Sequence, residues 1–145
     1  MNDFNDFSDK NEAHRKLVRI VEFYDAYQQL DDTQNCVDGY VEIDGDKFYT
    51  QEDVMDLMQD MPLSVEMRSV DWQQFGEPNY LPDEYRIVLT SGGPNTQVFG
   101  TLDSECEAGT AEIQYWHASK MVVLEDLSKH EQDALLWFAQ EFTLM

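Results

Sequence analysis

Carboxylates are the side chains of this sequence best placed to do chemistry. The chain carries 30 Asp and Glu against 9 Lys and Arg, which gives a formal net charge of −21. The acids are concentrated in residues 20–67, where 13 acidic residues accompany one basic residue, Lys47. Carboxylates attract cationic groups, so this segment predicts a surface that binds positive charge.

The most regular part of that segment is a row of acids on a predicted short helix. Glu52, Asp56 and Asp60 are spaced four residues apart, with Asp53 alongside. In a helix they would place a carboxylate about every 6 Å along one face. Like charges at this spacing destabilise a helix by a few tenths of a kcal/mol per pair. An arrangement that opposes folding favours a functional role.

We therefore predict that the acidic segment imitates the phosphates of a nucleic-acid backbone. Its target would be the basic surface of a protein that binds DNA or RNA. The candidate partner-binding residues are Glu52, Asp53, Asp56, Asp60, Asp44, Asp46, Glu42, Asp31 and Asp32. The competing interpretation is that the acidity serves only solubility, since a charged surface also keeps a protein soluble.

Other motifs that could carry chemistry are incomplete. Asp44-Gly45-Asp46 matches only two positions of a calcium loop and places its glycine wrongly, so it predicts a hairpin turn. Ser91-Gly92-Gly93-Pro94 lacks the following helix and the lysine of a phosphate-binding loop. It predicts a turn as well.

Histidine and cysteine give no recognisable site. His14, His117 and His130 lack the spacing of metal ligands, and Cys36 and Cys106 are too few for a disulfide framework. Free thiols are favoured over a single disulfide, and a Cys–His catalytic pair stands as an alternative that spacing does not test. We expect no metal, no cofactor and no enzymatic activity.

Length and composition predict one domain over residues 1–145, with 1–8 frayed. Hydrophobic residues make up 42% of the 145, enough for a folded core. The acidic N-terminus lacks the features of a signal peptide, and no apolar run is long enough to span a membrane. We expect a cytoplasmic protein that binds neither free nucleic acid nor a membrane. A homodimer is an open alternative.

The elements that must position the acids begin with a helix from Ser8 or Asp9 to about residue 30, set by apolar residues at helical spacing. Residues 39–50 predict a hairpin, because Asp44-Gly45 suits a tight turn. Thr50 would cap the short acidic helix, which Pro62 ends.

The second half of the chain alternates between apolar and polar residues. Strands are expected over 63–68, 84–90, 97–102 and 111–116, and residues 121–124 are either a further strand or an extended lead-in. Loops over 73–83 and 91–95 would connect the strands. Ser128 and Glu131 form a capping box at the start of a last helix.

Together these elements predict an α+β fold. It would be a four-stranded antiparallel meander packed by N- and C-terminal helices. A small hairpin and a short helix would be inserted near residues 39–61.

Residues 63–142 resemble a group of small, acidic, uncharacterised phage and plasmid proteins. The resemblance is carried by Tyr-Arg-Ile-Val-Leu-Thr-Ser-Gly-Gly-Pro at 85–94, by Val-Phe-Gly-Thr-Leu at 98–102, and by a closing helix rich in Leu and Phe. It implies an origin in a mobile element and supplies no catalytic motif. An inhibitor of anti-CRISPR or anti-restriction type is the function that it favours. The alternative is a structural or assembly subunit of a phage or plasmid.

Overall fold

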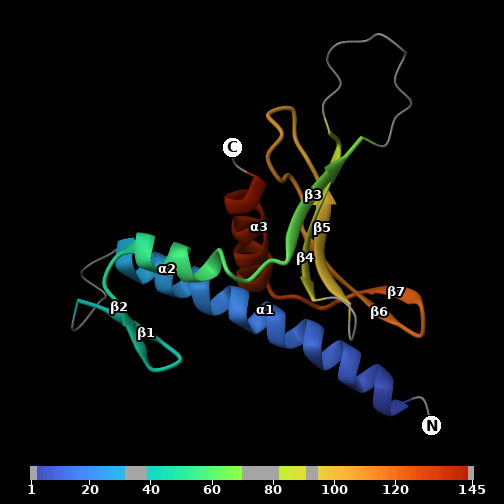
Figure 1. The fold of residues 1–145 in the computed structure, drawn as a ribbon, viewed down its shortest axis with the longest axis horizontal. Coiled ribbons are helices and arrows are strands. Elements are labelled where there is room, and N and C mark those ends of the chain that lie inside the picture. Colours follow the sequence, from blue (N-terminus) through green and yellow to red (C-terminus); the bar gives the residue numbers. More distant parts are fainter. Residues whose placement is uncertain (1–2, 32–38, 70–81, 91–94, 144–145) are drawn as a thin grey trace.

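The computed structural model describes residues 3–31, 39–69, 82–90 and 95–143, and its fold is α+β (Figure 1). The helices are α1 (Asp3–Asp31), α2 (Gln51–Met58) and α3 (Lys129–Thr143). The strands are β1 (Val41–Ile43), β2 (Asp46–Phe48), β3 (Ser64–Arg68), β4 (Glu84–Thr90), β5 (Thr96–Thr101), β6 (Glu112–His117) and β7 (Lys120–Val123).

The helix α1 is longer than the sequence pattern predicts. It begins at Asp3, so the expected start at Ser8 or Asp9 is wrong, whereas the expectation that residues 1–8 are frayed stays a prediction. The apolar residues at helical spacing that predicted this helix begin only at Leu17, so that pattern does not reveal the first turns of α1.

The predicted hairpin and short helix are confirmed. β1 and β2 pair in antiparallel register, and Asp44 and Gly45 both have positive φ angles, of 54° and 86°, as a tight two-residue turn requires. The Thr50 side chain accepts a hydrogen bond from the backbone N–H of Asp53 and so caps α2. The helix ends at Met58, before Pro62.

The large sheet is an antiparallel meander of five strands in the order β3-β4-β5-β6-β7, and the expectation of four strands is wrong. The fifth strand, β7, includes residues 121–123. The sequence left two alternatives for this segment, a further strand or an extended lead-in to the last helix. It pairs with β6 in antiparallel register, with Val123 opposite Gln114 at one end and Lys120 opposite His117 at the other. A four-residue edge strand gives a weak alternation signal, and only the pairing with β6 defines it.

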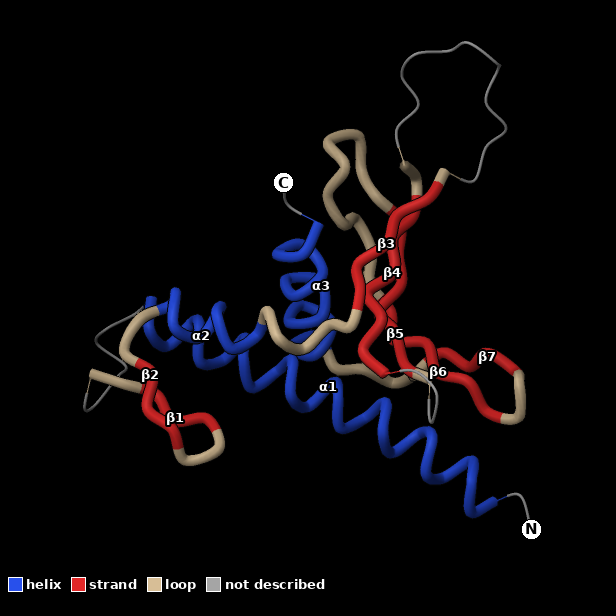
Figure 2. Tube along the Cα trace, viewed as in Figure 1, coloured by secondary structure: helices blue, strands red, loops and turns tan. Residues whose placement is uncertain are grey.

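The helix α3 lies on one side of this sheet (Figure 2), and the apolar residues on that face are buried. Ile87, Val98 and Ile113 occupy directly opposed positions on β4, β5 and β6 and are fully buried. They pack in one core with Phe23 of α1 and Phe138 of α3. The opposite face is bare of helices within the described part of the chain.

The last helix follows its predicted start. The N–H of Glu131 donates to Ser128 Oγ, and the N–H of Ser128 donates to a Glu131 carboxylate oxygen, which confirms the capping box. The predicted loop over 73–83 and the turn over 91–95 fall mostly outside the described residues, as does Cys36.

Candidate functional site

The acidic hairpin of β1 and β2 and the helix α2 both pack against the C-terminal half of α1 (Figure 1). The hairpin buries Val41 and Ile43, and α2 buries Val54 and Met58, so their apolar sides are fixed in the core. The Gln51 side chain also donates a hydrogen bond to the Tyr27 carbonyl at 3.1 Å. Burial of these apolar sides turns the polar sides of both elements outward.

Seven of the predicted partner-binding carboxylates lie on these two neighbouring elements or in the turn that follows α2, and all seven are exposed. We call them the acidic end: Glu42, Asp44, Asp46, Glu52, Asp53, Asp56 and Asp60. The remaining two are not placed with them. Asp31 is the last residue of α1, with an undescribed side chain, and Asp32 lies outside the described residues.

Little of this charge is neutralised within the described chain. Asp44 pairs with Arg19 of α1, with 2.8 Å between carboxylate oxygen and guanidinium nitrogen. Lys47, the only base of the hairpin, lies over the Tyr40 ring at 4.7 Å. The other six carboxylates make no ion pair with any described residue, so the acidic end keeps most of its negative charge.

The row on α2 differs from the predicted one. Asp60 lies two residues beyond the end of the helix, in a turn held by the hydrogen bond from its N–H to the Leu57 carbonyl. Glu52 and Asp53 lie in the first turn, where negative charge stabilises a helix by about 0.3–1 kcal/mol each. The inference that the whole row opposes folding is therefore wrong for these two.

Asp56 and Asp60 are in the opposite electrostatic situation. They lie toward the C-terminal end of α2, where the helix dipole disfavours negative charge and the last turn has no basic residue. The fold does not account for these two acids. Of the row, they are the stronger candidates for a functional role.

Comparison with protein-family models, curated proteins and solved structures found no significant match to this chain. Function must therefore be argued from the site itself. The described helices include none that is apolar over a length sufficient to span a membrane. In the described ranges, no group of three or more His, Cys, Asp and Glu side chains is arranged to hold a metal ion.

The remaining predicted motifs have structural explanations where they are described. His130 contacts Asp25 of α1, with 2.7 Å between Nε2 and Oδ1, and its ring lies 5.4 Å from that of Tyr24. It thereby helps to join α3 to α1. Cys106 is a free, partly buried cysteine in the turn between β5 and β6.

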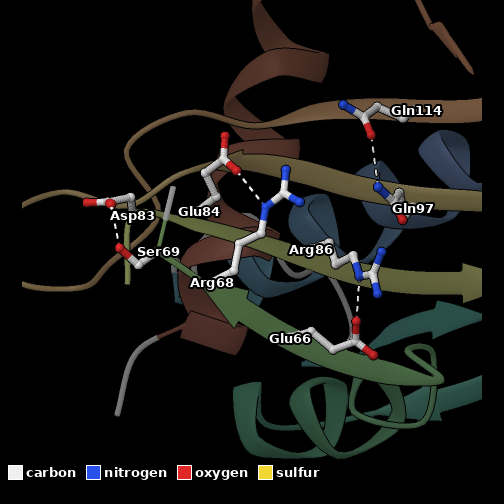
Figure 3. Close-up of polar contacts among 8 residues, drawn as sticks. All are labelled: Glu66, Arg68, Ser69, Asp83, Glu84, Arg86, Gln97 and Gln114. Carbon is white, nitrogen blue, oxygen red and sulfur yellow. Dashed lines mark hydrogen bonds and ion pairs between the residues drawn. The ribbon is translucent and has the colours of Figure 1, made fainter. Parts of the chain in front are cut away.

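A second candidate site, which the sequence did not reveal, is a concavity of about 590 Å³ on the bare face of the sheet. Two ion pairs join β3 to β4 across its floor, Arg68 with Glu84 and Arg86 with Glu66 (Figure 3). An acid and a base two residues apart in each strand, on the face opposite the apolar residues, is a signal that would have revealed these pairs.

The rest of the concavity is lined by amide side chains and by apolar side chains. The Gln97 amide of β5 donates to the Gln114 carbonyl of β6 at 2.8 Å, and both side chains are more than nine-tenths buried. Phe99 and Trp116 are half-buried beside them, and Met121 is 43% exposed. This face offers both hydrogen-bonding groups and apolar surface.

Proposed function

We propose that the chain is a binding protein whose acidic end docks on the basic surface of a nucleic-acid-binding protein, in place of nucleic acid. The observation that carries the proposal is the group of six exposed carboxylates that have no ion pair with a described residue, on adjacent elements fixed to one helix. The negative field of the whole chain would steer a basic partner toward it.

Defence nucleases are the proposed partner class. A CRISPR effector or a restriction enzyme holds DNA in a basic groove, which an acidic protein of this size can occupy. The resemblance to phage and plasmid proteins supports this partner class.

The alternative, a phage or plasmid assembly subunit, differs in its physical basis. Assembly would rest on apolar contact and depend weakly on salt. Competition with nucleic acid is electrostatic, so its affinity falls as salt screens the charges.

The test is charge reversal at the acidic end. The triple variant Glu52→Lys, Asp56→Lys, Asp60→Lys is compared with wild type for binding to a panel of purified restriction enzymes and CRISPR effectors, with duplex DNA as competitor. We expect wild type to bind a panel member, to be displaced by DNA, and to lose more than tenfold in affinity on reversal.

A matched control separates location from net charge. Glu105, Glu125 and Asp133 are exposed and lie outside the acidic end, and changing them to lysine alters the net charge equally. This variant should keep most of the affinity. Equal losses in the two variants, or binding that DNA does not displace, would contradict the proposal.

A further inference from the structure

The bare face of the sheet carries a hydrogen-bond relay with a fixed direction. Gln97 Nε2 donates to Gln114 Oε1, and Gln114 Nε2 donates to a Glu112 carboxylate oxygen at 2.9 Å. A carboxylate can only accept, so Gln114 must present its N–H₂ to Glu112 and its carbonyl to Gln97. Gln97 must then turn its own carbonyl away from β6.

The relay leaves one group without a partner in it, the side-chain carbonyl oxygen of Gln97, which is a strong hydrogen-bond acceptor. Gln97 is only 8% exposed, and its carbonyl oxygen has no hydrogen-bond partner among the described residues. Each amide of the relay polarises the next, and the relay ends on an anion, so the Gln97 oxygen accepts more strongly than an isolated amide. Among the described residues, Thr96 Oγ1 is the side-chain oxygen that is both fully buried and unpaired, so the Gln97 oxygen is accessible from the concavity and can accept from a ligand or from solvent.

A donor group lies on the neighbouring strand, on the same face as that acceptor. Val88 of β4 is directly opposite Gln97, and Arg86 is the diagonal neighbour on the same face. Arg86 uses Nε for its ion pair with Glu66 (Figure 3). No described residue accepts a hydrogen bond from its two terminal nitrogens. Its side chain is 54% exposed, so these donors are accessible.

An acceptor and a donor on the same face match the N–H and C=O of a peptide group. Phe99, Trp116 and Met121 line the same concavity and provide apolar surface for side chains next to that peptide group. A volume of about 590 Å³ is within the roughly 300–1,000 Å³ typical of ligand sites.

Charge selects among the polypeptides that could bind. Among the described residues, the charged groups on this face are Glu66, Glu84 and Glu112 against Arg68 and Arg86, which leaves one negative charge in excess. The chain as a whole carries −21, which repels a second copy and any acidic segment. The complementary occupant is an extended segment that combines basic with apolar residues.

We propose that the bare sheet face binds an extended basic and apolar peptide segment of the partner, with Gln97 and Arg86 contacting its backbone. The proposal rests on the proposed function only for the partner's positive charge. The two surfaces are separate, so a partner could contact the acidic end and this face together or either one alone.

The experiment is a titration of the full-length chain followed by nuclear magnetic resonance. The probe is a capped heptapeptide of three lysines alternating with two leucines between terminal glycines. Matched peptides replace leucine by serine or lysine by glutamate. We expect the probe to shift the side-chain amide signals of Gln97 and Gln114 and the Trp116 indole signal, and to bind at least threefold more tightly than the serine peptide.

Two pairs of variants separate recognition from charge attraction. Arg86→Met makes the chain more negative, so attraction alone predicts tighter binding, whereas loss of the backbone donor predicts binding at least threefold weaker. Arg15→Met changes the charge equally on an exposed part of α1 and should not weaken binding. Gln97→Met should also weaken binding, and Gln28→Met, exposed on α1, should not.

Each contrary outcome overturns the proposal. Tighter binding by both arginine variants would show charge attraction alone, and so would shifts confined to the acidic end. Equal affinity for the serine peptide would remove the role of the apolar residues. An oligothymidylate that shifts the same signals would assign the face to nucleic acid. Reversing Glu52, Asp56 and Asp60 should leave the effect of Gln97→Met intact, which keeps the two proposals distinguishable.

Discussion

Gly100 of β5 has no room for a side chain. It lies opposite Tyr85, whose hydroxyl donates to the Thr110 carbonyl at 2.6 Å. A Cβ atom at Gly100 would lie 2.1 Å from that carbonyl oxygen and 2.8 Å from the Tyr85 hydroxyl. The glycine therefore makes room for the tyrosine to cross β5.

We predict that Gly100→Ala lowers the free energy of unfolding by about 1–3 kcal/mol or more, because backbone atoms must move. Gly109→Ala is the control, since the nearest atoms to its added Cβ lie 3.8–3.9 Å away. Urea unfolding measures both variants. Similar stability in the two would show that the sheet adapts at Gly100 without strain.

Two buried threonines differ in their hydrogen bonding, so replacing each by valine should affect the free energy of unfolding in different ways. Thr143 Oγ1 accepts from the Ala108 N–H at 3.0 Å and donates to the Ala139 carbonyl, which ties the end of α3 to the turn before β6. Thr96 Oγ1 is buried without a hydrogen-bond partner among the described residues.

Thr143→Val should cost about 1–3 kcal/mol, because it leaves a buried N–H unsatisfied. Thr96→Val should cost nothing or stabilise the fold, because it removes an unpaired hydroxyl. The comparison is made by thermal and urea unfolding of the two variants. A larger loss at Thr96 than at Thr143 would refute the assigned hydrogen bonds.

Tyr85 predicts a dependence of stability on alkaline pH. Burial, and secondarily the negative charge of Glu112, raise the pKa of its phenol above the ordinary value. The unfolded chain then loses this proton at a lower pH than the folded chain. The stabilising contribution is complete below about pH 10 and declines as the pH rises above it.

Tyr85→Phe should be less stable than wild type at neutral pH, having lost the bond to Thr110. Its stability should fall less steeply between pH 10 and 11.5. Urea midpoints across that range test this, and parallel curves for the two proteins would contradict the pKa direction.

At the scale of elements, α2 has acids at both ends with opposite effects. Asp56→Asn with Asp60→Asn should raise the free energy of unfolding by about 0.5 kcal/mol, because it removes negative charge from the C-terminal end of the helix. Glu52→Gln with Asp53→Asn should lower it by a similar amount. Both effects should shrink in high salt.

Urea unfolding at low ionic strength measures the two pairs. If the first pair also weakens partner binding, Asp56 and Asp60 are retained for binding at a cost to stability. If the first pair destabilises the chain, the electrostatic account of this helix is wrong.

At the scale of the whole molecule, net charge opposes folding. The negative charges repel one another more strongly in the compact state, and salt screens that repulsion. We predict that stability at pH 7 rises by about 1 kcal/mol or more between 10 mM and 300 mM sodium chloride. The lysine triple variant at Glu52, Asp56 and Asp60 should show a smaller rise. A fall in stability with salt would mean that ion pairs outweigh repulsion.

The sequence by itself determined the local features of this protein. The turn at Asp44-Gly45, the cap at Thr50 and the capping box of Ser128 and Glu131 depend on residues a few positions apart, so their identities suffice. The alternation of strands and the apolar stripes of the helices likewise predicted an α+β fold and the exposed side of α2.

Only the tertiary structure decided which charges remain unpaired and which polar groups meet. The contact of Asp25 with His130 joins residues 105 positions apart, and Arg19 reaches Asp44 only because the hairpin packs on α1. The relay from Gln97 to Glu112 likewise needs the exact pairing of β5 with β6. Such contacts follow from how the elements pack, and residues distant in sequence carry no local signal of that packing.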